Sequence, residues 1–295
     1  MLGRATAEIP LKHLKQGENM VQFAAGKQIA YGFNWGFYWI YSFTIRVYCD
    51  SSVPAPAGRI LAPAAGETVA ENPQIEAEAW SPNGAIRQVD FLGEYEDFNW
   101  EGDGVFHQWH YVSRKGVLDK HIGTASQPPY RTVWDTRWIP DQSGPIRLMA
   151  RIVDESGMCS MTPAVEGVAL AREKRRVRMF QADNFPENFA ARAGKRLVCP
   201  IVIEGGLDEA RAAKLVLSTW SAATDTGETH EIGLNGHRIA DNFGRFHDHS
   251  FDQLDVPLET LKEGENELHI YSVYKGHGLE INWPGPVLLI EYAKQ

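Results

Sequence analysis

An internal repeat constrains this sequence more than any other feature. Residues 8–23 read EIPLKHLKQGENMVQF and residues 255–270 read DVPLETLKEGENELHI, so seven of the sixteen aligned positions are identical. Each copy predicts a strand, a Gly-Glu-Asn turn and a second strand, which together make a hairpin-like unit. The likeness continues weakly downstream, where both copies end in an alternating strand pattern, FTIRVY and VLLIEY. The two ends of the chain are therefore predicted to contain related β-structure.

The two copies differ in what precedes them. About 78 residues of strand-like sequence, beginning near Val177, lead up to Asp255, and they include Asn235-Gly236, which suits a type I′ hairpin turn. Only seven residues precede Glu8. A sandwich cannot close its core with its last strands alone. We therefore expect residues 1–52 to be a partial sandwich that packs against the middle domain or pairs with a second copy in a homodimer, and we expect upstream strands in the natural gene.

The middle of the chain, residues 56–172, follows a different pattern of short strands after a Pro/Ala/Gly-rich linker. It resembles the bacterial Ig-like modules of surface and polysaccharide-active proteins. The residues that carry the resemblance are Ala62-Pro63, Gly66, Val69, Val89-Asp90-Phe91, Ile122-Gly123, Pro129-Tyr130, Trp134-Asp135-Thr136, Gly144, Leu148, Ala150, Asp154 and Gly157. Residues 94–121 depart from the family pattern as an insertion. Long insertions in compact domains tend to be functional.

The C-terminal region, residues 177–295, resembles the galactose-binding-like jelly rolls of carbohydrate-binding modules and of accessory domains in glycoside hydrolases and lyases. The resemblance is carried by Leu234-Asn235-Gly236 and by the phrase from Val256 to Asn266. Together the two resemblances imply an all-β protein made of β-sandwiches, with a partial copy of the second at the N-terminus. They also imply a secreted or cell-surface location in a multi-module protein that acts on polysaccharide.

Charge and hydropathy exclude several classes of partner. The net charge is −9, so a nucleic acid held through its phosphates is not expected. The one basic run, residues 172–176, is interpreted as a solvated linker between domains. No apolar stretch approaches the roughly 18 residues of a membrane span. Because the first ten residues are polar, an export signal is expected to be removed or to lie upstream of Met1.

The insertion contains a candidate calcium loop. Oxygen-bearing side chains alternate with other residues at Asp97, Asn99, Glu101 and Asp103, and a glycine follows. Ca²⁺ takes six to eight oxygen ligands, and such alternation lets a tight turn direct several of them inward. The EF-hand pattern is incomplete, because Gln108 stands where the bidentate glutamate would be. The alternative interpretation is an acidic, solvated turn.

Histidines and aromatic residues are the candidate ligand-binding groups. His247, His249 and His277 could line a saccharide groove or bind a metal ion, or they could only hydrogen-bond loops. Trp100 and Trp109 on the insertion are candidates for a platform that stacks on sugar rings. The competing interpretation is that these rings fill a core. The same choice applies to the six aromatic residues between Tyr31 and Trp39.

Catalytic motifs do not stand out. The sequence has no G-x-S-x-G elbow, no H-E-x-x-H, no P-loop and no dinucleotide fingerprint. Paired carboxylates of a glycosidase are defined by spatial position and not by sequence spacing. The sequence therefore favours a non-catalytic carbohydrate-binding or scaffold portion of a larger protein. The alternatives are a polysaccharide hydrolase or lyase that uses His and Glu groups of the C-terminal region, and a purely structural spacer.

Overall fold

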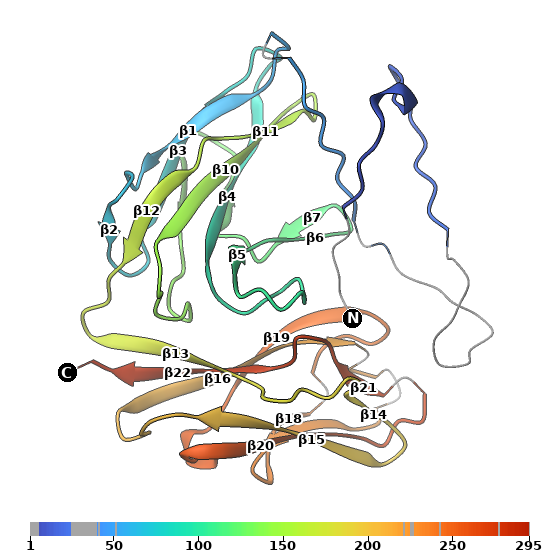
Figure 1. Ribbon diagram of the computed structural model, residues 1–295, viewed down its shortest axis with the longest axis vertical. Coiled ribbons are helices and arrows are strands. Elements are labelled where there is room, and N and C mark those ends of the chain that lie inside the picture. Colours follow the sequence, from blue (N-terminus) through green and yellow to red (C-terminus); the bar gives the residue numbers. More distant parts are fainter. Residues whose placement is uncertain are drawn as a thin grey trace.

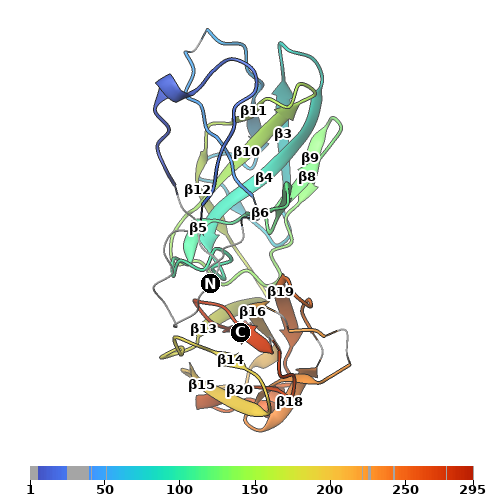
Figure 2. The ribbon, with the colours of Figure 1, turned by 90° about the vertical axis from the view of Figure 1, so that its right-hand side faces the viewer.

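The computed structural model describes residues 6–24, 40, 42–50, 52–220, 222–224, 227–241, 243–276 and 278–294. Nearly all of its regular structure is β, which confirms the predicted fold class. Two stacked groups of sheets make up the molecule, one containing β1 to β12 and the other β13 to β22 (Figures 1 and 2). The described helices are two three-residue 3-10 turns, and neither is long enough to cross a membrane.

The first sandwich contains two main sheets and a small hairpin. One sheet has the order β1 (Ala57–Ala62), β3 (Gln74–Trp80), β9 (Tyr130–Val133). The other has the order β2 (Thr68–Val69), β12 (Val165–Leu170), β10 (Ile146–Asp154), β4 (Ile86–Glu96), β5 (His107–Trp109), with β8 (Gly123–Ala125) on β4 and β11 (Cys159–Met161) on β10. The hairpin joins β6 (Val112–Arg114) to β7 (Val117–Asp119).

The C-terminal sandwich also contains two sheets. One has the order β13 (Arg175–Gln181), β22 (Val287–Ala293), β16 (Ala210–Trp220), β21 (Leu279–Ile281), β14 (Ala190–Ala191), with β19 (His249–Asp255) paired to β16. The other has the order β15 (Lys195–Ile203), β20 (Gly264–Ser272), β17 (His230–Leu234), β18 (His237–Asp241).

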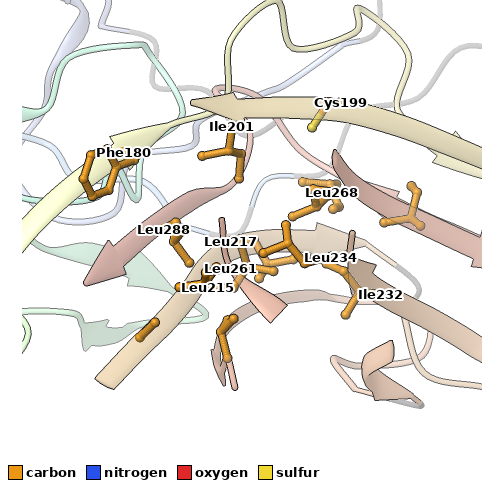
Figure 3. Packing of buried hydrophobic residues seen from close by; sticks show 14 of the residues in the cluster. Phe180, Cys199, Ile201, Leu215, Leu217, Ile232, Leu234, Leu261, Leu268 and Leu288 are labelled. Atoms are coloured by element: carbon orange, nitrogen blue, oxygen red, sulfur yellow. The ribbon is translucent and has the colours of Figure 1, made fainter. Parts of the chain in front are cut away.

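Alternation of apolar residues explains how each sandwich closes. Along β10, every second residue from Ile146 to Ile152 is fully buried in the first core. In the C-terminal core, Ile201, Leu217 and Leu268 meet from three different strands (Figure 3). Successive side chains of a strand point to opposite faces, so this period places one apolar face of each sheet toward its partner sheet.

The predicted Asn235-Gly236 turn joins β17 to β18. Leu234 pairs with His237, so the loop between them has two residues. Both loop residues have positive φ, 51° for Asn235 and 83° for Gly236. A type I′ turn requires this backbone at both central positions, which is why Asn-Gly favours it.

The N-terminal segment differs from the prediction. Residues 6–24 and 42–50 contain a single 3-10 turn, η1 (Leu11–His13), and no strand. The strand expected over residues 43–48 is therefore wrong for this structure. A strand needs a neighbour to complete its hydrogen bonds, and in both views residues 6–24 run beside the first sandwich, outside its sheets (Figures 1 and 2). The aromatic run from Tyr31 to Trp39 lies outside the described residues.

Candidate functional site: the interdomain core and the loop end of the C-terminal sandwich

The insertion, residues 94–121, forms a third hydrophobic core between the two sandwiches. Phe98 and Trp100 are buried there against four residues on the outer face of the β13-β22-β16 sheet, namely Val177, Val216, Val287 and Leu289. Trp100 also makes an edge-to-face contact with Phe251 of β19, with ring centroids 5.4 Å apart. Trp100 is 4% exposed. The interpretation of its ring as an exposed sugar platform therefore needs correction, because the ring belongs to an interdomain core.

Trp109 lies at the end of β5 and is half-buried. The Arg147 guanidinium carbon stands 5.5 Å from the centroid of its ring, so a cation–π contact covers the ring. Arg147 is itself fixed by Glu94 at 2.6 Å and by Glu166 at 2.9 Å. A sugar would have to compete with this arginine for the aromatic face.

The acidic loop of the insertion is closed by its own hydrogen bonds. Asn99 Oδ1 accepts from the backbone N–H groups of Glu101 (3.0 Å) and Gly102 (2.9 Å) and from Gln108 Nε2 (2.8 Å). Asn99 Nδ2 donates to Asp103 Oδ1. These bonds account for the alternating oxygen side chains as an Asx-type turn.

No group of three or more His, Cys, Asp or Glu side chains is placed to hold a metal ion among the residues that the structure describes. Asn99 Oδ1 already receives three donors, which leaves it no lone pair for a cation. Calcium at Asp97, Asn99, Glu101 and Asp103 stays a prediction. In the present arrangement, Asn99 does not fit the role of a ligand.

Asp97 faces a small cavity between the two sandwiches. The cavity has a volume of about 120 Å³ and is lined by Asp97, Trp100, Asp135, Trp138, Ile139, Val216, Gln253 and Leu289. Burial raises the pKa of Asp97 to about 7. Hydrogen bonds from the Phe98 backbone and the Trp100 side chain, and the charge of Lys120, act in the opposite direction. The interdomain core therefore contains a carboxyl group that titrates near neutral pH.

The basic run at residues 172–176 is part of the same interface. Arg172 is 5% exposed and contacts Asp141 at 2.7 Å, and it also donates to the backbone carbonyl of Ile139 at 2.6 Å. Arg175 bridges Glu71 of the first sandwich and Glu291 of the second. The interpretation of this run as a solvated linker is therefore wrong for Arg172 and Arg175, whereas the other three residues of the run are exposed. Carboxylates and carbonyls from both domains contact these two arginines, and this fixes the junction.

The β6–β7 hairpin extends the insertion to the end of the C-terminal sandwich where β19 begins. Lys115 at the hairpin turn forms an ion pair with Asp248 at 3.1 Å. Arg114 Nη1 donates to the backbone carbonyl of His249. The segment from His247 to His249, which was predicted to bind ligand, is thus held in place by the insertion.

A chain of aromatic rings lies at this loop end. Neighbouring ring centroids are 4.7 to 6.3 Å apart, and the order of rings is His249, Trp220, His247, Phe246, Tyr274, His230. These residues come from the ends of β16, β17, β19 and β20 or from the loops beside them. His247 is exposed, and Trp220, Phe246 and Tyr274 are half-buried. The structure therefore brings His247 and His249 together, whereas His277 lies outside the described residues.

His249 is held neutral within this cluster. Burial lowers its pKa to about 4. Its Nδ1 lies 3.2 Å from the Asn282 side-chain amide, which acts as the donor, so the neutral ring carries its proton on Nε2. Both sides of the imidazole are engaged within the protein, because Nδ1 accepts from Asn282 and the ring also has a hydrogen bond to the Thr219 backbone. What the cluster offers a ligand is therefore the uncharged aromatic faces of its rings.

Sequence reasoning missed Trp220, Phe246, Tyr274 and His230 as members of this cluster. Each lies at or near a strand end, and the strand ends meet only when the sandwich closes. It also missed that the outer face of the sheet is covered. The run VLLI at residues 287–290 was the available signal, because a strand that is apolar on both faces is buried on both sides.

No family model matches this sequence, and no curated protein matches it. Solved structures with similar regions include a β-porphyranase of glycoside hydrolase family 86 from the human gut bacterium Bacteroides plebeius, with 12% identity and a TM-score of 0.32, over 76% of this chain and 36% of that chain. The fibronectin(III)-like modules of Clostridium thermocellum CbhA match with 15% identity and a TM-score of 0.24, over 75% and 88% of the two chains.

Carbohydrate-binding modules from the β-sandwich superfamily match with 10% identity and a TM-score of 0.22, over 81% of this chain and 97% of that chain. The chain spans about a third of the length of the β-porphyranase. At these TM-scores the likeness does not identify a function, which has to be argued from the residues of this chain.

Proposed function

We propose that this chain is a non-catalytic scaffold unit of a larger secreted or surface protein that acts on carbohydrate, in which the insertion fixes two β-sandwiches in one orientation. The observation that supports this proposal is the core of Phe98 and Trp100 between the two sandwiches. An insertion that provided only a binding platform would expose its rings. Here the rings are buried on the partner domain, and Arg175 with Glu71 and Lys115 with Asp248 make ion pairs across the same junction.

Small-angle X-ray scattering on the whole chain tests the scaffold. Trp100→Ala removes the ring that joins Phe98 to Phe251, so the two sandwiches are expected to separate and the radius of gyration to increase. Trp80→Ala is the matched control, because Trp80 is an exposed tryptophan of the first sandwich. If the radius of gyration of the Trp100 variant is unchanged while each domain stays folded, the insertion does not act as a scaffold.

Saccharide binding at the loop end is a second function, which the chain of rings favours. The half-buried aromatic faces of Trp220, Phe246 and Tyr274 offer stacking surfaces, which suit the apolar face of a sugar ring. The Ig-like and jelly-roll resemblances point to the same class of ligand. Catalysis as a hydrolase or lyase has weaker support, because the His249 ring is engaged within the protein by the Asn282 amide and the Thr219 backbone.

A glycan array on the purified full chain tests this second function. Trp220→Ala is expected to abolish retention of any bound glycan, since Trp220 contacts both His249 and His247. Trp80→Ala, the control variant, is expected to retain the bound glycan. Retention by the Trp220 variant would place the binding site elsewhere, and activity assays on bound glycans would detect turnover.

A further inference from the structure

The two copies of the repeat adopt the same backbone at opposite ends of the molecule. In each copy a 3-10 turn follows a proline, with φ −59° and ψ 128° at Pro10 and φ −61° and ψ 126° at Pro257. Gly17 and Gly264 both have positive φ, 88° and 81°. The seven shared residues therefore encode a local structure that forms whether or not strands surround it.

A shared asparagine closes both turns with the same hydrogen bonds. Asn19 Oδ1 accepts from the Lys15 backbone N–H at 3.0 Å, and Asn19 Nδ2 donates to the carbonyls of Lys15 at 2.8 Å and Gly17 at 2.9 Å. Its counterpart Asn266 repeats all three bonds, at 3.0, 2.8 and 2.9 Å, with the residues four and two positions before it. Identical geometry in two surroundings shows that the turn is a preformed element.

The surroundings of the two copies differ completely. In the C-terminal copy, Asn266 and the apolar side chains that follow it are buried inside the sandwich. In the N-terminal copy, Asn19 and the matching side chains are exposed. The exposed fractions of the matched pairs are 42% and 5% for Ile9 and Val256, 41% and 0% for Val21 and Leu268, and 49% and 0% for Phe23 and Ile270.

The pattern that buries the C-terminal copy is thus retained in a segment whose side chains are exposed. Ile9, Val21 and Phe23 are apolar at three of the positions that face the core in the other copy. Phe23 contacts the ring of Phe43, with centroids 5.7 Å apart, but it stays 49% exposed. The exposed face of residues 9–23 therefore matches the shape and polarity of a sandwich closing strand.

The C-terminal copy shows what kind of surface receives such an element. Its strand β20 lies between β15 and β17, paired to both. Asn235 of the β17–β18 turn donates from Nδ2 to the Thr260 carbonyl and to Asn266 Oδ1, each at 2.8 Å, and its Oδ1 accepts from the Glu267 backbone N–H at 2.9 Å. The receiver is a slot between two strands with an Asn-Gly turn beside it.

We propose that residues 9–23 are an interaction surface that closes a second β-sandwich of the C-terminal type, one that lacks its own closing strand. The surface supplies the strand with Ile9, Val21 and Phe23 facing inward. Asn19 supplies the acceptor for an asparagine on the turn of the receiving hairpin.

A graft into the full chain tests whether the segment is a competent closing element. Residues 255–270 are replaced by the sequence of residues 8–23, which changes nine positions. The C-terminal sandwich is expected to keep cooperative unfolding, with the Tm lowered by about 5–10 °C because Phe in place of Ile270 overpacks the core. The control graft carries the same sixteen residues in shuffled order. A graft that melts like the shuffled control would overturn the proposal.

A fusion tests the docking itself. Residues 173–254 are placed directly before Glu8 of the complete chain, so that they precede the N-terminal copy as they precede the C-terminal one. The amides of Val21 and Phe23 are expected to exchange with solvent at least 100-fold more slowly than in the unfused chain. Asn19→Ala in the fusion should erase this protection, and Lys12→Ala, at an exposed position, should not. Equal exchange rates in fused and unfused chains would contradict the proposal.

Discussion

The aromatic residues of the insertion and those of the loop end differ in how deeply they are buried. Phe98 and Trp100 lie on a covered sheet face and are almost fully buried, whereas Trp220 and Phe246 lie among strand ends and stay half-exposed. Both groups combine rings with acidic and basic neighbours. The surface opposite each group makes the difference. The insertion core faces Val216, Val287 and Leu289, whereas the loop end is contacted by the charged residues Arg114 and Lys115. A ring becomes core where an apolar partner surface lies opposite it.

Truncation of the buried ring should have the largest effect on stability. Phe98→Ala removes a fully buried ring from the interdomain core and is expected to lower the free energy of unfolding by about 3–5 kcal/mol. Urea denaturation followed by tryptophan fluorescence measures it. Trp80→Ala should change stability by less than about 1 kcal/mol, since Trp80 is 53% exposed. If the two variants lose equal stability, the distinction between interface and surface rings fails.

The pH dependence of stability should reveal the carboxyl group beside that ring. Because burial raises the pKa of Asp97 from 3.8 to about 7, folding favours its protonated form. The stabilisation is complete below about pH 4 and is lost as the pH rises to about 7, with a slope of about 1.4 kcal/mol for each pH unit between those limits. Asp97→Asn should abolish this component.

Thermal melts of the wild type and of Asp97→Asn at half-unit steps from pH 4 to 8 measure the difference. The variant should gain stability relative to the wild type as the pH rises. Parallel curves would show that Asp97 is ionised throughout and that the interface tolerates its charge.

The acidic loop should show a smaller effect. Asn99→Ala removes the acceptor of three hydrogen bonds and is expected to cost about 1–2 kcal/mol in the presence of chelator, because the turn and not an ion closes the loop. Asp103→Asn, at an exposed position, should cost less. Calorimetry of each variant with EDTA and with calcium separates the causes, and a Tm of the wild type that rises with calcium would confirm the ion site predicted from sequence.

The smallest effect is expected at the loop end. His249 ring signals in NMR should titrate near pH 4, because burial lowers its pKa to about 4. Protonation is disfavoured in the folded state, so stability falls as the pH drops from about 6.5 toward 4. Asn282→Ala should alter the His249 ring signals and cost about 1 kcal/mol, because Asn282 is 2% exposed and its Nδ2 donates to His249 Nδ1. Titration near 6.5 in the wild type would show that the ring is solvated and that the cluster is open.

The strands of both sandwiches could be predicted because alternation reports directly on which face is buried. The Asn235-Gly236 turn could be predicted because two positive φ values require those residue types. The burial of Trp100 could not be predicted, since the sequence around an aromatic residue in an insertion does not show which surface that residue contacts. The sign of a covered surface was the apolar run at residues 287–290, which is apolar on both faces of its strand.

The N-terminal copy shows the same limit from another side. Its turn formed as the repeat implies, because Asn19 closes it with local hydrogen bonds. Its strands did not form within the described residues, because a strand depends on a neighbour that a local pattern cannot supply. The ring cluster depends on four strand ends that are far apart in sequence, so His247 and His249 were found by their residue type and Trp220 was not.

The sheet β13-β22-β16, which is apolar on both faces, has a consequence for how these domains can be inherited and engineered. A domain whose sheets are apolar toward the core and polar toward solvent can be moved between proteins as an independent module. The C-terminal sandwich does not meet this condition, because its excision would expose Val216, Val287 and Leu289 to solvent as an apolar patch. We therefore expect the two sandwiches to be inherited together. Recombination near residue 172 would expose both sides of the interdomain core and make both halves prone to aggregation.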